Sequence, residues 1–342
     1  MDGSQILSTW PRFMARLALA AAIIVGVAGA AGACSRKAAP VPEARLRIGL
    51  VTKTETNPFF VKLREAATER ARQQGAELIA LSGKFEGDNE GQVAAIENLI
   101  GKGVKGILVT PSNSSALVGA IKRARDKGIL VTALDTPTEP PDAVDGTFAT
   151  DNRQAGRLQG AWLKQALGGR AAKIVMLDGV PGGGTDTQRH QGFLAGCGIE
   201  ETDQAIVGRA HVYGDQAKAH AAMENLLQAH PDVNVVYTIN EQVARGAYAA
   251  IAARRATGAI LIGSIDGACT GVSDVKAGKL GATVMQFPTR MAEQGIDAVV
   301  EYARTGRRPA GFIDTGVQLI TDLPHPGLEA RDTAFGLASC WG

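Results

Sequence analysis

The sequence predicts an α/β protein with two similar doubly wound domains, each built around a parallel sheet. From Leu46 onward, short apolar runs alternate with stretches that carry Ala, Leu or Ile at every third or fourth position. The short continuous runs are typical of buried parallel strands, and the longer spacing is typical of amphipathic helices. Because 342 residues hold more strand–helix units than one sheet accommodates, we expect two domains, with a first break near Ala149–Asp151.

The expected strands are the apolar runs Leu46–Val51, Leu78–Leu81, Gly106–Thr110, Ile129–Leu134, Thr147–Ala149, Ile174–Leu177, Val233–Ile239, Ile260–Ile265 and Leu280–Met285. The expected helices between them are Val61–Gln74, Gln92–Gly101, Ala116–Lys127, Gln154–Leu167, Ala217–Ala229 and Gln242–Arg254. Asn57 followed by Pro58 predicts a helix start, because Asn caps free N–H groups and Pro suits the first helical position. Gly75 and Gly128 end the first and third helices.

The charge balance argues against nucleic acid as a partner, because 36 Lys and Arg residues face 34 Asp and Glu residues. Aromatic residues make up only 5% of the chain, yet Phe59 and Phe60 stand side by side after the first strand. Successive helical residues point about 100° apart. We therefore expect one ring to belong to the core and the other to face a ligand.

The N-terminal residues have the organisation of a secretory signal. Arg12 and Arg16 precede an uncharged run from Leu17 to Ala33 that ends in small residues. Signal peptidase could cleave after Ala31–Ala33, which would make residues 1–33 the signal, and Met14 could be the true start.

Cys34 offers a second processing route, because it could become the acylated first residue of a lipoprotein. Residues 34–45 are rich in Pro and Ala and suit a tether or linker. We expect a periplasmic or otherwise exported protein, held at a membrane only through a lipid on Cys34.

Polar side chains follow most of the predicted strands, at the edge where doubly wound sheets bind ligands. Carboxylates, amides and a guanidinium suit vicinal hydroxyls, and an aromatic face suits the C–H side of a sugar ring. The residues after the strands are Lys53, Glu55, Asn57, Phe59, Phe60, Ser112, Asn113, Asp135, Thr136, Asp151, Asn152, Asp186, Arg189, Asn240, Glu241, Asp266 and Gln286.

Several of these residues also have a purely structural interpretation. Helix caps could explain Asn57, Asp135, Asn240 and Asp266, and a surface ion pair could explain Arg189. Their agreement at strand ends favours a ligand site. The Gly-rich "GVPGGG" lacks dinucleotide-binding spacing and is interpreted as a flexible turn, and no P-loop, nucleophile-elbow or zinc-protease motif occurs. We expect no cofactor, and the scattered Cys and His residues predict no metal site.

The ordered fragments "NPFF", "LDTP", "ATDN", "QRHQGF", "YTINE", "SIDG" and "VMQFP" resemble exported sugar-binding proteins of the ribose, galactose and fructose type, which feed ABC importers. The resemblance runs from about Leu46 to the end of the chain. "KTETNPFF", "GKFEGDNEGQ" and the final "CWG" are most similar to fructose-binding members. The resemblance implies a periplasmic binding protein-like fold of type I. In this fold, the chain passes between the two domains three times, and these crossings form the hinge.

The resemblance also implies the sugar-contacting residues: Asn57, Phe59, Phe60, Asp135, Asn152, Arg189, Asn240, Asp266 and Gln286. Two positions depart from ribose binders, which carry Arg where this chain has Thr136 and an aromatic residue where it has Gly214. We therefore expect fructose first, with mannose or ribose behind it.

The resemblance implies one disulfide. If Cys34 is acylated or removed, an odd number of cysteines remains. Fructose-type relatives have a matching pair, so Cys269 and Cys340 should be bonded and should hold the chain's end. Cys197 then packs as a small apolar residue.

The predicted function is capture of a monosaccharide and its delivery to the transmembrane subunits of an ABC permease. Two alternatives stay open. The protein could be a sugar sensor that presents its closed form to a membrane receptor, or its ligand could be a different polyol or a pentose. An enzyme is disfavoured by the missing motifs, and a sugar-responsive repressor by the signal that replaces a DNA-binding segment.

The implied domains are 46–150 with 287–312 and 151–286 with 313–342. We expect the chain to pass between the two domains near Ala149–Asn152, Gln286–Pro288 and Phe312–Thr315. We expect a monomer.

Overall fold

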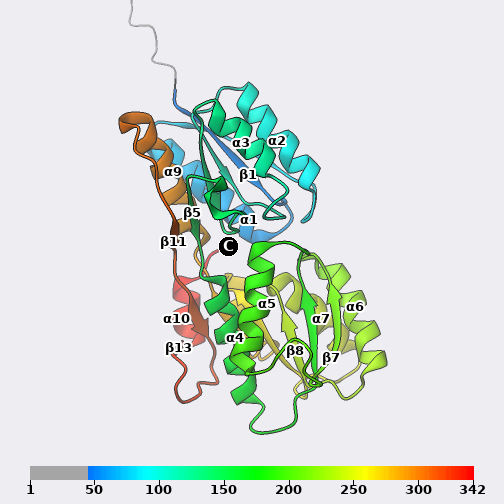
Figure 1. Ribbon diagram of the computed structural model, residues 1–342. Coiled ribbons are helices and arrows are strands. Elements are labelled where there is room, and N and C mark those ends of the chain that lie inside the picture. Colours follow the sequence, from blue (N-terminus) through cyan, green and yellow to red (C-terminus); the bar gives the residue numbers. More distant parts are fainter. Residues whose placement is uncertain (1–44) are drawn as a thin grey trace, which may run out of the picture. The chain divides into compact units, whose positions relative to one another are not determined.

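The computed structural model describes residues 45–342, and its first sheet is entirely parallel with the order β11-β5-β4-β3-β1-β2. Its strands are β1 (Arg47–Thr52), β2 (Glu77–Ser82), β3 (Gly106–Val109), β4 (Leu130–Leu134), β5 (Gly146–Ala149) and β11 (Phe312–Asp314). Its helices are α1 (Pro58–Gln73), α2 (Asn89–Gly101), α3 (Val118–Asp126) and α9 (Pro288–Thr305). A 3₁₀ turn, Pro141–Ala143, precedes β5. We call this sheet and its helices the first lobe (Figure 1).

The second sheet has the order β13-β12-β10-β9-β8-β6-β7, and β12 is antiparallel to β10. Its strands are β6 (Ile174–Asp178), β7 (Ile206–His211), β8 (Val235–Thr238), β9 (Leu261–Asp266), β10 (Ala282–Met285), β12 (Gln318–Ile320) and β13 (Ala330–Arg331). Its helices are α4 (Asn152–Ala166), α5 (Gly184–Cys197), α6 (Gln216–Ala229), α7 (Glu241–Ala253), α8 (Cys269–Lys276) and α10 (Thr333–Ser339). These elements form the second lobe (Figure 1).

The two sheets share one topology. In each, the chain's first strand lies between its second and third, as in β2-β1-β3-β4-β5 and β7-β6-β8-β9-β10. This order is a doubly wound arrangement with a switch point beside the first strand. The prediction of two similar parallel-sheet α/β domains is confirmed.

Apolar packing explains why the helices cover these sheets. In the first lobe, Leu63 of α1 and Ile296 of α9 belong to one buried cluster with Ile48, Leu108 and Leu134 of the strands. A second cluster lies under α2 and α3. The second lobe has a larger continuous core, in which Trp162 and Tyr237 are fully buried. Burying such side chains is the main stabilising term of both lobes.

Several elements escaped sequence reasoning for physical reasons. The strand β7 lies at the edge of its sheet and is only partly buried, so its run Ile206–His211 includes Gly208 and Arg209. The helix α5 starts within the Gly-rich segment that was expected to be only a flexible turn. By contrast, helix α1 begins at Pro58, where Asn57 and Pro58 predicted a helix start, and Asn57 caps it; the apolar run expected from Val61 lies within this helix.

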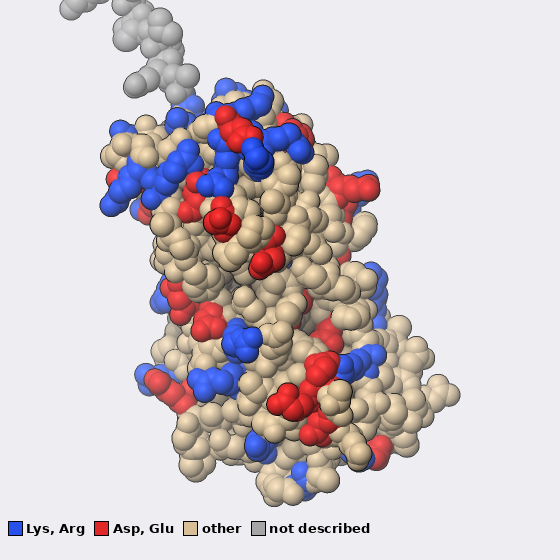
Figure 2. Space-filling view, in the orientation of Figure 1, with Lys and Arg blue, Asp and Glu red and all other residues tan. Residues whose placement is uncertain are grey.

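Charged residues of both signs cover the face shown in Figure 2. Basic side chains gather over α3 and α9 of the first lobe, where Asp145 pairs with both Arg125 and Arg308. Within residues 45–342, no helix is long and apolar enough to cross a membrane. The expected signal peptide, the acylation candidate Cys34 and the tether up to residue 44 lie outside the described residues.

Candidate ligand-binding site

A cavity between the lobes is lined by ten of the seventeen residues that follow the predicted strands. Its walls surround about 340 Å³ of space between atoms, part of which is open to solvent, and the centre of a water-sized sphere can move within only about 20 Å³. Its lining residues are Lys53, Asn57, Phe59, Phe60, Glu86, Asp135, Thr185, Asp186, Arg189, Gly214, Ile239, Asn240, Asp266 and Gln286. Of the nine residues named above as sugar-contacting, the structure places only Asn152 outside this lining.

Two phenylalanine rings form one wall of the cavity. Phe59 and Phe60 lie in the first turn of α1, and both are buried. Their ring centroids are 5.3 Å apart with planes at 87°, an edge-to-face geometry that aromatic pairs favour. Both rings line the cavity, and both also belong to the buried cluster of the first lobe, so the core and the cavity share them. The edge-to-face contact lets adjacent residues share one side of the site.

Asn57 serves both the helix and the cavity. Its Oδ1 accepts a hydrogen bond from Phe59 N at 3.0 Å, which caps α1, while its Nδ2 donates to Glu86 Oε1 at 3.0 Å. Burial raises the pKa of Glu86 to about 7, although Lys53 and Asn57 oppose the shift. Glu86 escaped sequence reasoning because it lies in an irregular segment between β2 and α2. The signal that could have identified Glu86 was its position in the segment "GKFEGDNEGQ", which resembles fructose-binding members.

Gly214 makes room for Glu86. A Cβ on residue 214 would lie 2.8 Å from Glu86 Oε1 and 3.1 Å from Asn240 Nδ2, and the backbone φ of +65° also favours glycine. The small residue that distinguishes this chain from the ribose pattern therefore allows a carboxylate to enter the cavity.

A buried ion pair lies at the end of the first-lobe strands. Lys53 Nζ is 3.5 Å from Asp135 Oδ2, and both side chains are 4% exposed. Burial works to lower the pKa of Lys53, but Asp135, Asp186 and Glu86 outweigh it and raise that pKa. Thr136 Oγ1 donates to Asp135 Oδ2 at 2.8 Å. Lys53 follows β1 directly, so its strand-end position was the available signal.

Arg189 provides the guanidinium of the second lobe. Its Nε donates to Asn152 Oδ1 at 2.8 Å, and its Nη1 donates to Ile239 O at 2.9 Å. Its buried Nη2 has no hydrogen-bond partner among the described residues. Nη1 also lies 3.9 Å from Asp266 Oδ1. Asn152 thus lies behind Arg189 and orients it, and one guanidinium nitrogen stays free to donate to a ligand.

Glycines set the position of Arg189. The helices α4 and α5 pack closely, and a Cβ on Gly156 would lie 2.1 Å from Arg189 O. Such a short distance cannot be relieved by a rotamer change, because the opposing atom is backbone. The close approach brings Arg189 within reach of Asn152.

Acidic and amide groups complete the second-lobe side. Gln286 Nε2 donates to Asp266 Oδ1 at 2.8 Å, and its Oε1 accepts from Thr150 Oγ1 at 3.2 Å. Burial raises the pKa of Asp266, and Arg189 opposes this shift. Burial also raises the pKa of Asp186, whose Oδ2 lacks a partner among the described residues. Asn240 caps α7 through Val243 N and lines the cavity as well.

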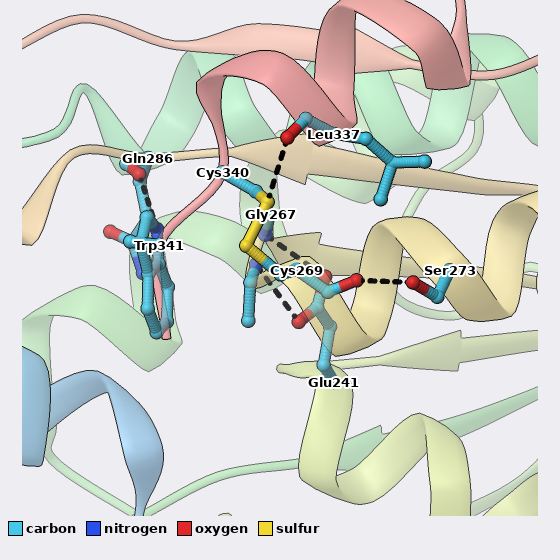
Figure 3. The surroundings of a disulfide bond; sticks show 9 residues. Glu241, Gly267, Cys269, Ser273, Gln286, Leu337, Cys340 and Trp341 are labelled. Carbon is cyan, nitrogen blue, oxygen red and sulfur yellow. Dashed lines mark hydrogen bonds between the residues drawn. A yellow bond between two sulfur atoms is a disulfide. The ribbon is translucent and has the colours of Figure 1, made fainter.

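Figure 3 shows how the turn that carries Asp266 is held. Glu241 accepts hydrogen bonds from Gly267 N at 2.9 Å, Ala268 N at 3.2 Å and Thr283 Oγ1 at 2.7 Å. Burial first, and then the Asp266 carboxylate, raise the pKa of Glu241. The next residue of the turn, Cys269, is disulfide-bonded to Cys340, as the resemblance implied. The free thiol of Cys197 is buried.

The lobes touch directly at the rim of the cavity. Thr185 Oγ1 donates to Asp135 O at 3.1 Å, and the hydroxyl oxygens of Thr136 and Thr185 are in contact, 2.8 Å apart. Gly184 N donates to Ser114 Oγ at 2.9 Å. These bonds join loops from opposite lobes, so the structure has a closed cleft.

The lining is chemically suited to a neutral polyhydroxylated molecule. Four carboxyl groups, those of Glu86, Asp135, Asp186 and Asp266, exceed the two cations, Lys53 and Arg189. An anionic ligand would meet this surplus of acids, whereas hydroxyls can donate to the acids and accept from the cations. Among residues 45–342, no cluster of side chains is arranged to hold a metal ion.

A wider groove in the second lobe is less suited to a ligand. Its principal charged groups satisfy one another, since His190 lies 2.7 Å from both Asp178 Oδ1 and Glu201 Oε2. Arg209 also pairs with Glu201. Because these groups already have partners, the interlobe cavity remains the better candidate.

Residues 48–308 match the family described as periplasmic binding protein domain. The ribose import binding protein of Bacillus subtilis (strain 168) is 33% identical over 73% of this chain and 79% of that protein. A solute-binding protein from Actinobacillus succinogenes 130z, solved with bound D-allose, has a TM-score of 0.74 and 27% identity, covering 81% of this chain and 98% of that one. One from Agrobacterium vitis, with bound D-fucose, has a TM-score of 0.75 and 29% identity, covering 81% and 95%.

The chain belongs to the periplasmic binding protein family, whose members bind solutes and are not enzymes. Within that family, it groups with the ribose- and allose-type proteins of sugar importers.

Proposed function

We propose that this protein binds a monosaccharide between its lobes and delivers it to the transmembrane subunits of an ABC permease. The observation that carries the proposal is the interlobe cavity, which is lined by two phenylalanine rings together with buried acids, amides and a guanidinium with a free nitrogen. This combination suits a sugar ring, whose C–H face packs on aromatic groups and whose hydroxyls exchange hydrogen bonds. The import functions named for the relatives support the same role.

We propose fructose as the preferred ligand, with mannose or ribose behind it. Gly214 and Glu86 support a hexose, because the carboxylate adds hydrogen-bond acceptors that one more hydroxyl could use. Thr136, in place of the Arg of ribose binders, turns its hydroxyl to Asp135, so that the only cation paired with this carboxylate among the described residues is Lys53. The likeness of "KTETNPFF", "GKFEGDNEGQ" and "CWG" to fructose binders adds to this support.

Capture requires the lobes to separate. In the closed cleft, the free space at the cavity's centre is close to what one water molecule needs, so a sugar cannot enter without motion. We propose two domains, 46–150 with 287–312 and 151–286 with 313–342, which open about crossings near residues 149–152, 286–288 and 312–315. The strand β11 ends at Asp314, so the third crossing would follow that residue. A sugar that contacts both domains favours the closed form by its differential affinity.

The remaining cellular features are proposals as well. The N-terminal pattern supports export through a signal in residues 1–33, with acylation of Cys34 as the alternative to simple cleavage. We propose a monomer that recognises its permease in the closed form.

Sugar binding is tested by thermal shift, followed by calorimetry, with fructose, mannose, ribose, allose, galactose and myo-inositol. A ligand at 100 times its Kd stabilises the native state by about 2.7 kcal/mol, which a melting curve resolves. Fructose should give the largest shift, and fructose 6-phosphate should give none, because the site's surplus carboxylates repel a phosphate. If no sugar shifts the melting curve, the proposed function is wrong. A response to ribose or inositol with none to fructose would refute only the choice of sugar.

A second candidate function is sugar sensing, in which the closed form is presented to a membrane receptor. It uses the same cavity, so the discriminating measurement is uptake of the labelled sugar by cells with and without this protein. Loss of uptake supports the importer, whereas unchanged uptake by a protein that binds the sugar supports sensing.

A further inference from the structure

The last residues of the chain are locked to the turn that carries Asp266. The disulfide joins Cys340 to Cys269, the first residue of α8, and Cys269 N donates to Trp341 O at 3.0 Å. Ala268 and Trp341 also form a short parallel β-bridge. The backbone of Trp341 is therefore held covalently and by hydrogen bonding to the second lobe (Figure 3).

The Trp341 side chain points away from that attachment and packs with first-lobe residues. It is 6% exposed and belongs to the same buried cluster as Phe59, Phe60 and Met291. Its ring lies 5.6 Å from the Phe59 ring at 75°, an edge-to-face contact. Since Phe59 also meets Phe60 edge to face, Trp341 supports the aromatic wall of the cavity from behind.

The indole N–H fixes a second part of the site. Trp341 Nε1 donates to Gln286 O at 2.9 Å in a buried hydrogen bond. The side chain of the same Gln286 donates to Asp266 Oδ1 and accepts from Thr150 Oγ1. One tryptophan thus contacts cavity-lining residues at both the aromatic and the polar sides of the site, although it does not line the cavity itself.

We propose that Trp341 is a positioning residue for the ligand, anchored by the Cys269–Cys340 disulfide. Trp341 fixes the orientation of the Phe59 ring and the position of the Gln286 backbone at the same time. Sugar affinity therefore depends on the last residues of the chain. The inference rests on the proposed function, because it concerns the affinity of that same cavity. A residue with only a structural role would change stability and leave affinity intact.

The chain contains a matched control in Trp162. This residue is also fully buried, and its Nε1 also donates to a backbone oxygen, that of Leu323, at 3.1 Å. It lies in the second-lobe core and does not line the cavity. Trp162→Phe therefore removes the same kind of hydrogen bond without touching the site.

The experiment measures Kd for the sugar that binds the wild-type protein, together with unfolding by denaturant, in the full chain. We expect Trp341→Phe to weaken binding about threefold, because the edge contact stays and one hydrogen bond is lost. Trp341→Ala should weaken it about tenfold or more, and the Cys269→Ser/Cys340→Ser double variant should weaken it about threefold. Trp162→Phe should lower stability and leave Kd unchanged.

The outcomes separate the two proposals. If the wild-type protein binds no sugar, the proposed function fails and this inference falls with it. If the wild-type protein binds and Trp341→Phe keeps the wild-type Kd, Trp341 is structural only and the inference is overturned. An equal loss of affinity in Trp162→Phe would also overturn it, because affinity would then follow stability. Should Trp341→Ala fail to fold, the comparison of the two Phe variants decides.

Discussion

Replacing Arg189 with Met is the most direct perturbation of the site. Methionine keeps much of the side chain's length and removes every N–H donor. In the wild-type protein, two guanidinium nitrogens bond to Asn152 and Ile239, and the third has no partner among the described residues. We propose that this third nitrogen donates to a sugar hydroxyl. The substitution therefore removes one charge-assisted bond to the ligand and two bonds within the protein.

The magnitudes follow from these contacts. A hydrogen bond to a charged group contributes about 1.5–3 kcal/mol, which corresponds to a Kd between about 10-fold and 150-fold weaker. In the folded protein, Asn152 Oδ1 and Ile239 O lose their donor. Each unsatisfied buried acceptor costs about 1–3 kcal/mol of unfolding free energy. Removing the guanidinium also leaves the buried Asp266 carboxylate without the cation 3.9 Å away, which adds to that loss.

Calorimetry with the preferred sugar measures the affinity, and urea unfolding measures the stability. Arg245→Met is the matched control, because Arg245 donates to Asp274 at 2.9 Å in the same lobe and does not line the cavity. Arg245→Met should keep the wild-type Kd. A folded Arg189→Met variant that binds within twofold of wild type would refute the assignment of Arg189 to the ligand.

Three further predictions concern other features of the structure. Gly214→Ala should weaken sugar binding severalfold, because its Cβ would press on Glu86 Oε1; calorimetry measures the change. The free energy of unfolding should fall as pH rises from about 4.5 to about 7, because the folded protein keeps a proton on Glu86 that the unfolded chain releases; Glu86→Gln should reduce this slope in denaturant titrations at successive pH values, and the raised pKa values of Asp186, Glu241 and Asp266 should maintain the rest of it. Thiol labelling of the denatured, unreduced protein should modify Cys197 and leave Cys269 and Cys340 unmodified.

A different result would contradict each of these predictions. Gly258 also has a positive φ, with no atom near the added Cβ, so Gly258→Ala should carry the backbone strain without affecting Kd. An equal loss in both glycine variants would mean that strain, and not Glu86, is responsible. The exposed Glu77→Gln should keep the wild-type pH slope, and a slope as steep in Glu86→Gln as in the wild-type protein would exclude a contribution from Glu86. Labelling of Cys269 or Cys340 without reductant would contradict the disulfide.

Local patterns were sufficient for most of the fold. The strands β1, β3 to β6 and β8 to β10 are buried, and the partly buried edge strand β2 also has an apolar run, Leu78–Leu81, so all of them can be identified without any knowledge of neighbours. The edge strand β7 lacks such a run because two of its residues are exposed, and β12 and β13 are too short, at three and two residues, to show one. Whether such a segment becomes a strand depends on which strand it pairs with, and pairing is a tertiary property.

The same division holds for the site. Asn57, Asp135, Arg189, Asn240, Asp266 and Gln286 could be named in advance, because a doubly wound sheet brings the residues after its strands to one edge. That rule is topological and requires no distances. The disulfide was inferred through resemblance, and the structure contains it.

What only the tertiary structure decided is how residues far apart in the sequence act on one another. Glu86 lies in an irregular loop, and only the folded chain shows that it bonds to Asn57 and occupies the space left by Gly214. Trp341 is next to last in the sequence, yet its ring lies against Phe59 and its N–H bonds to Gln286. Hydrophobic periodicity and strand-end positions are properties of neighbouring residues, so the sequence alone determines them. Contacts across the lobes depend on how the two sheets pack and close, and no local pattern specifies that.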